Sequence, residues 1–161
     1  MSSADPIYPD AKHPDEFQRG MEWQDFVCKA LLRDGIVLQN YMSKKMQYEA
    51  GENVQGWEIK LDEPCMRTKR LSIEVAEKKM ASRLFWTDSG IMSCLNPWLY
   101  IQGNRQILFI FATKTLRAWM SKNNPPVIEK RQPNPTIKTF YIPIDEAERI
   151  ALKVVRFEDI P

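Results

Sequence analysis

The sequence predicts an α/β domain in which helices flank a mixed β-sheet. Three observations lead there: apolar residues recur at helical spacing near the start, charged and apolar residues alternate in the middle, and strand and helix patterns follow one another towards the end. The 161 residues, 43% hydrophobic and 27% charged, are enough for one domain with its own core. We therefore expect an irregular arm over residues 1–14 and a single domain over residues 15–161.

The first expected helix covers residues 15–34. Asp15, followed three residues later by Gln18, resembles a capping box, and the helical repeat of apolar residues runs on until Asp34-Gly35. The polar face of this helix carries Glu22, whose carboxylate could reach a neighbouring active site. An exposed polar face without a catalytic role is the alternative.

The densest charge pattern begins at Glu58. Residues two apart in a strand point to one side, so Glu58, Lys60 and Asp62 share a charged face. Residues 71–78 predict a second strand, and the polar residues between the two predict an antiparallel hairpin. That pairing would bring Asp62 close to Glu74, and neighbouring carboxylates repel each other unless a cation lies between them. A divalent-metal site is therefore expected here, with a solvated face of cross-strand ion pairs as the alternative.

The remaining elements follow in chain order. We expect strands at residues 36–41, 98–101, 106–112 and 139–143, and a loop at residues 123–135. Helices are expected at residues 114–121 and from Asp145, with Val154 as the last residue of the second helix's apolar stripe. The stretch Ile107–Phe111 is apolar on both faces and predicts a buried central strand. Pro143 removes a backbone donor, which favours an edge position for the last strand.

Composition excludes several classes of function. The only histidine, His13, falls in the expected arm, which argues against a Ser-His-Asp triad and against histidine-based zinc sites. The three cysteines are scattered and lack a Cys-x-x-Cys spacing, which indicates a reducing compartment and no structural zinc. The start of the chain has no apolar signal core, and we expect a soluble intracellular protein without a membrane partner.

Several short motifs together carry a resemblance to a known family. They are Gln47-Tyr48, Gly51-Glu52-Asn53, Gly56–Asp62, Ile73-Glu74, Glu77-Lys78, Ser89-Gly90-Ile91 and Trp98–Gly103. Together with the leading helix they resemble the PD-(D/E)XK nuclease superfamily and, more narrowly, small phage and prophage proteins regarded as nucleases. The resemblance implies a restriction-endonuclease-like fold, hydrolysis of DNA phosphodiesters, and location in the cytoplasm of a bacterial host cell.

The resemblance also implies roles for single residues. Asp62 and Glu74 would hold Mg²⁺ or Mn²⁺, which suits hard carboxylate oxygens. In the family a lysine stands two residues after the second acid, where this chain has Ala76. Lys78, further along the same face, and Lys60, on the other expected strand, are the two candidates to replace it.

A basic group surrounds the expected hairpin and predicts salt-dependent, non-specific contacts to DNA phosphates. Its members are Arg67, Lys69, Arg70, Lys78, Lys79 and Arg83. Two other readings remain: a nuclease fold without catalysis that binds nucleic acid or protein, and an interaction protein with no nucleic-acid role. The oligomeric state is open, with a homodimer as one alternative.

Overall fold

The computed structural model describes residues 14–40, 53–78, 84–131 and 136–157. The chain divides into two compact units, Met1–Val37 and Leu38–Pro161, and each is described by itself. Of the expected N-terminal arm, residues 1–13 lie outside the described part. No helix among the described residues is long and apolar enough to cross a membrane.

The described residues of the first unit form one long helix, α1 (Pro14–Arg33), which confirms the helix predicted for residues 15–34. The helix ends in a Schellman motif, because Ile36 N–H donates to the Leu31 carbonyl and Gly35 N–H donates to the Leu32 carbonyl. Gly35 takes a φ of 75°, a left-handed conformation that glycine adopts without strain. The sequence signal at Asp34-Gly35 therefore marks a real helix end.

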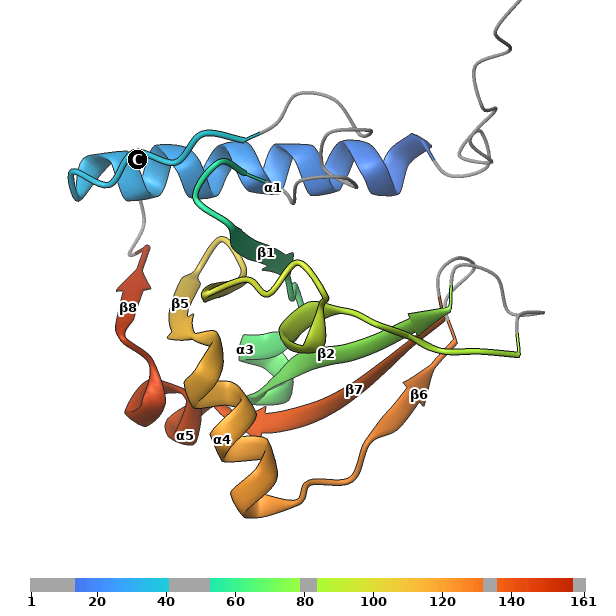
Figure 1. The fold of residues 1–161 in the computed structure, drawn as a ribbon. Coiled ribbons are helices and arrows are strands. Elements are labelled where there is room, and N and C mark those ends of the chain that lie inside the picture. The colour runs from blue at the N-terminus through green and yellow to red at the C-terminus, as the bar shows by residue number, and fades with distance from the viewer. Residues whose placement is uncertain (1–13, 41–52, 79–83, 132–135, 158–161) are drawn as a thin grey trace, which may run out of the picture. The chain divides into compact units, whose positions relative to one another are not determined.

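The second unit contains two four-stranded sheets (Figure 1). The first has the order β1-β4-β5-β8, formed by Trp57–Leu61, Leu99–Gly103, Ile107–Ala112 and Lys153–Arg156. β1 runs parallel to β4, and the other neighbours are antiparallel, so this sheet is mixed. β5 is buried along nearly its whole length between β4 and β8, which confirms the central strand predicted from its two-sided apolar sequence.

The second sheet has the order β3-β2-β7-β6, with all neighbours antiparallel. Its strands are Thr87–Asp88, Arg70–Lys78, Thr136–Pro143 and Ile128–Lys130. Figure 1 shows β2 and β7 as long strands side by side. Along β2 the apolar residues Leu71, Ile73 and Val75 are buried, and the polar residues between them are more exposed. This alternation indicates one core face and one polar face.

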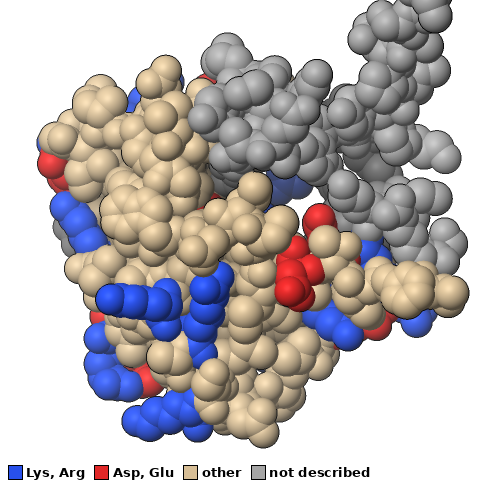
Figure 2. Space-filling view, viewed as in Figure 1, with Lys and Arg blue, Asp and Glu red and all other residues tan. Residues whose placement is uncertain are grey.

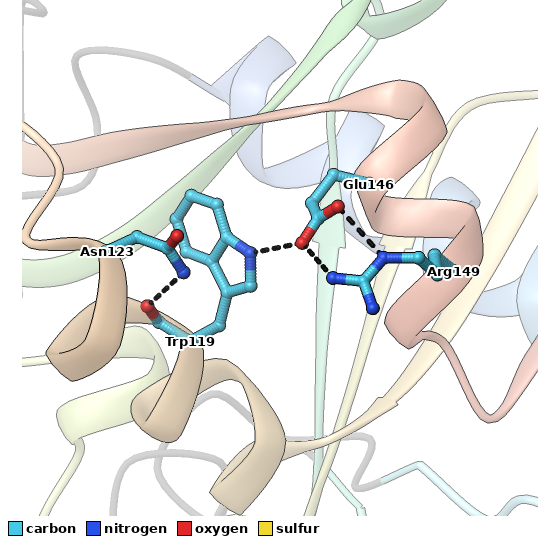
Figure 3. Close-up of polar contacts among 4 residues, drawn as sticks. All are labelled: Trp119, Asn123, Glu146 and Arg149. Carbon is cyan, nitrogen blue, oxygen red and sulfur yellow. Dashed lines mark hydrogen bonds and ion pairs between the residues drawn. The ribbon is translucent and has the colours of Figure 1, made fainter.

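The core of the second unit joins both sheets and two helices, α4 (Thr113–Asn123) and α5 (Ile144–Ile150). Phe109, Leu116 and Phe140 are fully buried there, and burial of each such side chain contributes about 1.5–3 kcal/mol. Figure 3 shows how the helices are joined: the Trp119 ring nitrogen donates a hydrogen bond of 2.9 Å to Glu146, which also pairs with Arg149.

Two short helical turns complete the described part of this unit. α3 (Cys65–Thr68) follows β1, and the 3₁₀ turn η2 (Gly90–Met92) packs against β2. Gly90 has a φ of 53°, and a Cβ there would lie 2.3 Å from the carbonyl oxygen of Glu74. Only glycine allows this close approach of η2 to β2.

The mixed α/β class is confirmed, and several details of the prediction are wrong. The expected single sheet is two sheets. The hairpin between residues 58–62 and 71–78 does not form, because β1 pairs with β4 and β2 pairs with β3 and β7. Residues 36–39 form no strand, and Asn40 makes only an isolated bridge to Asn53.

The C-terminal third differs from the prediction in three places. β7 is longer than residues 139–143 and lies inside its sheet rather than at the edge, because Pro143 is its final residue and leaves the preceding ladder intact. β6 lies within the expected loop at residues 123–135. The last helix ends at Ile150, and Val154 belongs to β8 instead of continuing the helical stripe.

Candidate active site

β1 presents its charged face as predicted from the alternation of its residues. The Lys60 ammonium lies 2.8 Å from Oε1 of Glu58, two residues earlier on the same face. A strand places such side chains side by side, so the pairing follows directly from local geometry. The ion pair is partly shielded, with 29% of the Lys60 side chain and 15% of the Glu58 side chain exposed.

Glu74 on β2 reaches the same lysine from the other sheet. Its Oε2 lies 3.7 Å from the Lys60 ammonium, and its side chain is 13% exposed. One ammonium therefore lies within ion-pair distance of two carboxylates that are 16 residues apart in sequence and belong to different sheets. We call Glu58, Lys60 and Glu74, with the neighbouring Tyr100, the acid–lysine cluster.

Tyr100 is paired with Glu58 across the parallel β1–β4 ladder and is fully buried. Burial raises the pKa of its hydroxyl well above the ordinary value; the charge of Lys60 opposes this, and those of Glu74 and Glu58 add to it. The hydroxyl lies beside the Glu74 backbone, and a hydrogen bond with that backbone opposes the rise in its pKa. The cluster therefore contains a neutral buried donor as well as three charged groups.

Asp62, immediately after β1, has a different environment. Its Oδ2 accepts a hydrogen bond of 2.8 Å from the backbone N–H of Ser72 and one of 3.0 Å from the side-chain amide of Gln102. Gln102 also donates to the Ser72 carbonyl oxygen at 2.8 Å. Asp62 and Gln102 therefore bond the backbone N–H and the carbonyl of Ser72, as a neighbouring strand would. We call this arrangement the Asp62–Gln102 edge cap.

Burial dominates the electrostatics of Asp62, which is only 7% exposed. Removal from water raises the pKa of its carboxyl above 3.8, while the hydrogen bond from Ser72, the charge of Lys130 and the hydrogen bond from Gln102 act in the opposite direction. Lys130 lies near Asp62, because its ammonium donates to the hydroxyl of Ser72 at 2.5 Å and the backbone N–H of Ser72 bonds Asp62. Oδ2 of Asp62 is thus already occupied by protein donors.

Three other residues that the sequence associated with the site make contacts of their own. Lys78 lies over the Trp86 ring, with its ammonium 4.7 Å from the ring centroid. Ala76 pairs with Lys138 and Asp88 in the second sheet. Glu22 lies on α1, in the unit described separately, where it accepts a hydrogen bond of 3.0 Å from Gln18.

The predicted DNA contacts fall into two groups. Arg67, Lys69 and Arg70 are exposed at the end of α3 and the start of β2. Lys79 and Arg83 lie outside the described residues. Figure 2 shows lysine and arginine side chains also gathered where α4, α5 and β8 lie in Figure 1, so positive charge is not confined to the start of β2.

The sequence did not point to three residues in or beside these two arrangements: Tyr100, Gln102 and Lys130. Tyr100 and Gln102 alternate with apolar residues along β4, a period-two signal that would have placed them on one face. Nothing in the sequence links them to β1, because the parallel pairing joins segments about 40 residues apart. Lys130 had no signal, since it fell in an expected loop.

Fold and site together define a mixed α/β protein with an acid–lysine cluster between two sheets. Comparison of the chain with known protein families, characterised proteins and solved structures found no match. Within the described ranges, no three histidine, cysteine, aspartate or glutamate side chains come together in a way that could hold a metal ion. The cluster offers two carboxylates from different strands.

Proposed function

We propose that the protein is a metal-dependent DNA phosphodiester hydrolase of the PD-(D/E)XK type, with a restriction-endonuclease-like ancestry for its fold. The observation that carries the proposal is the position of the Lys60 ammonium, 2.8 Å from Glu58 and 3.7 Å from Glu74. Two carboxylates and a lysine in one partly exposed place are the chemical groups that such a reaction uses.

The donor set fits a hard divalent cation. Mg²⁺ prefers oxygen ligands, keeps several waters, and is commonly held by only one or two protein carboxylates. Glu58 and Glu74 would hold it, and the buried Tyr100 hydroxyl would donate a hydrogen bond to a carboxylate or a bound water. When bound, the metal would neutralise charge on the phosphate and make a water more acidic. Asp62 fits less well, because its Oδ2 accepts two protein hydrogen bonds.

In this proposal Lys60 is the catalytic lysine, which the resemblance expects two residues after an acid. Glu58 and Lys60 have that spacing on β1, whereas the position two residues after Glu74 is Ala76. A lysine side chain is long and flexible, so its ammonium could turn from the carboxylates to a phosphate oxygen once a metal replaced it. Its role would be to stabilise negative charge at the phosphate.

The second candidate is a nuclease-like domain that binds nucleic acid without cleaving it. The same ion pairs favour it, since Lys60 can neutralise the two carboxylates permanently and leave no need for a metal. The two candidates differ in one respect only: whether a divalent cation can take the place of the ammonium.

Thermal unfolding with and without Mg²⁺ or Mn²⁺, followed by cleavage of single- and double-stranded DNA, tests the proposal. A cation that binds the folded state raises the melting temperature, and Glu58→Gln and Glu74→Gln should each remove most of that shift. Glu129→Gln, on the exposed edge strand β6, is the matched control and should keep it. Lys60→Met should keep metal binding and lose cleavage.

Two results would overturn the proposal. One is a wild-type protein whose melting temperature does not respond to either metal and which cleaves neither form of DNA. The other is full cleavage by Glu74→Gln. Retention of DNA without cleavage would establish the binding domain in its place.

A further inference from the structure

A pair of cations meets on a tyrosine at the start of β2, outside the acid–lysine cluster. The guanidinium carbon of Arg70 lies 3.9 Å from the centroid of the Tyr141 ring, and the Lys130 ammonium lies 5.0 Å from the same centroid. The three residues come from β2, β6 and β7, so the sheet itself brings them together. Arg70 is exposed and the other two are half-buried.

These two cations have no carboxylate partner among the described residues. Other cations among the described residues do pair with a glutamate: Lys60, Arg131, Arg149 and Arg156. Asp62 is the acid that Lys130 acts on electrostatically, and its Oδ2 is already bonded within the edge cap. Two like charges held on one ring repel each other, so an anion between them would be favourable. The Tyr141 ring offsets part of that repulsion through cation–π attraction.

We propose that Arg70, Lys130 and Tyr141 form a binding site for a phosphate group of the DNA strand. The choice of DNA as the ligand rests on the proposed function. A guanidinium offers two parallel N–H donors to a phosphate, and a lysine adds a point charge. The Lys130 ammonium keeps its bond to the Ser72 hydroxyl and has further protons to donate.

The position of the site within the sheet indicates which phosphate it holds. Arg70, Ser72 and Glu74 alternate along one face of β2, so the two ends of this row are about 13 Å apart at the usual rise of a strand. A phosphate beside Arg70 is therefore not the one cleaved at Glu74. It is a neighbouring phosphate of the same strand, and the site positions the strand without reading its bases.

Binding of a fluorescein-labelled twenty-nucleotide oligothymidylate, followed by anisotropy at several NaCl concentrations in EDTA, tests this site without any metal. We expect Arg70→Gln/Lys130→Gln to bind about tenfold or more weakly, with a salt slope smaller by about 0.7, the value for one phosphate contact on a single strand. Arg70→Lys should recover part of the slope, because it keeps a charge. Tyr141→Leu should weaken binding while leaving both cations in place.

Lys114→Gln is the matched control, since it removes an exposed cation from α4 without touching the site. Each single variant, Arg70→Gln and Lys130→Gln, provides the test if the double variant fails to fold. Unchanged affinity and slope in folded variants, or an equal loss in Lys114→Gln, would refute the site. Because EDTA prevents metal-dependent cleavage, loss of the hydrolase proposal and loss of this site give different results.

Discussion

Removal of the Asp62 carboxylate tests the edge cap directly. Asp62→Ala would leave the backbone N–H of Ser72 and the amide of Gln102 without their acceptor, in a place where Asp62 itself is 7% exposed. A buried donor left unpaired costs about 1–3 kcal/mol. Two such donors would be left, and removal of the buried charge of Asp62 offsets part of their combined cost. We therefore expect the free energy of unfolding to fall by about 2–4 kcal/mol.

Asp62→Asn separates the hydrogen bonds from the charge. Its carbonyl oxygen can accept from both Ser72 and Gln102, so we expect a change in unfolding free energy below about 1 kcal/mol. Urea unfolding followed by tryptophan fluorescence measures both variants, and Asp88→Ala on exposed β3 is the control. A loss below about 0.5 kcal/mol for Asp62→Ala would show that the cap contributes nothing.

The stability difference between wild type and Asp62→Asn should depend on pH. Burial raises the pKa of Asp62 above 3.8, so the folded protein binds this proton more readily than the unfolded chain does. The contribution of Asp62 to stability therefore rises as the pH falls from neutral through the raised pKa. Wild type should gain stability relative to Asp62→Asn over that window. A constant difference between pH 7 and pH 4 would refute the assigned cause.

Three further predictions follow from other parts of the second unit. Burial, with the charge of Asp62, raises the pKa of the Cys65 thiol to about 11. Ellman's reagent at pH 8 should therefore react quickly with exposed Cys94 and spare Cys65 in the folded protein. The prediction is wrong if the rapid reaction with the reagent disappears in Cys65→Ser instead of in Cys94→Ser. Gly90→Ala should destabilise the folded protein by about 1–3 kcal/mol, because the new Cβ would have a left-handed φ and would meet the Glu74 carbonyl. Gly20→Ala should not destabilise it, because nothing lies within 4 Å of a Cβ there. Equal melting temperatures for Gly90→Ala and wild type would refute the contact. Hydrogen bonds from Arg149 and Trp119 lower the pKa of Glu146 below 4.5, so its stabilising effect should be lost as the pH falls through the lowered value, and Trp119→Phe should raise that pKa in an NMR titration.

Local patterns were enough to predict elements whose signals lie within one segment. The end of α1 followed from Asp34-Gly35, and the burial of β5 followed from five consecutive apolar residues. The charged face of β1 followed from strict alternation, because that periodicity depends only on the strand's own geometry. Each of these predictions needed no knowledge of which other segment would pair with it.

Pairing between distant segments was the part that the sequence did not reveal. The polar run from Pro64 to Arg70 has the composition of a hairpin turn, yet it forms α3 and carries the chain from one sheet to the other. The true partner of β1 is β4, and a parallel pairing needs a long connection that leaves no local mark. Asp62 and Glu74 were therefore assigned to one site, although their side chains make different contacts.

The placement of Glu58 and Glu74 on different sheets has a consequence for both candidate functions. Two carboxylates that face each other across a seam repel unless a cation lies between them, and Lys60 supplies that cation in the structure. If Lys60 is purely structural, Lys60→Met leaves the repulsion uncompensated and weakens the contact between the sheets at neutral pH. If the seam is a metal site, Mg²⁺ compensates the same loss and restores stability to Lys60→Met. The response of this one variant to Mg²⁺ therefore separates a permanent ion pair from a lysine that stands where a metal binds.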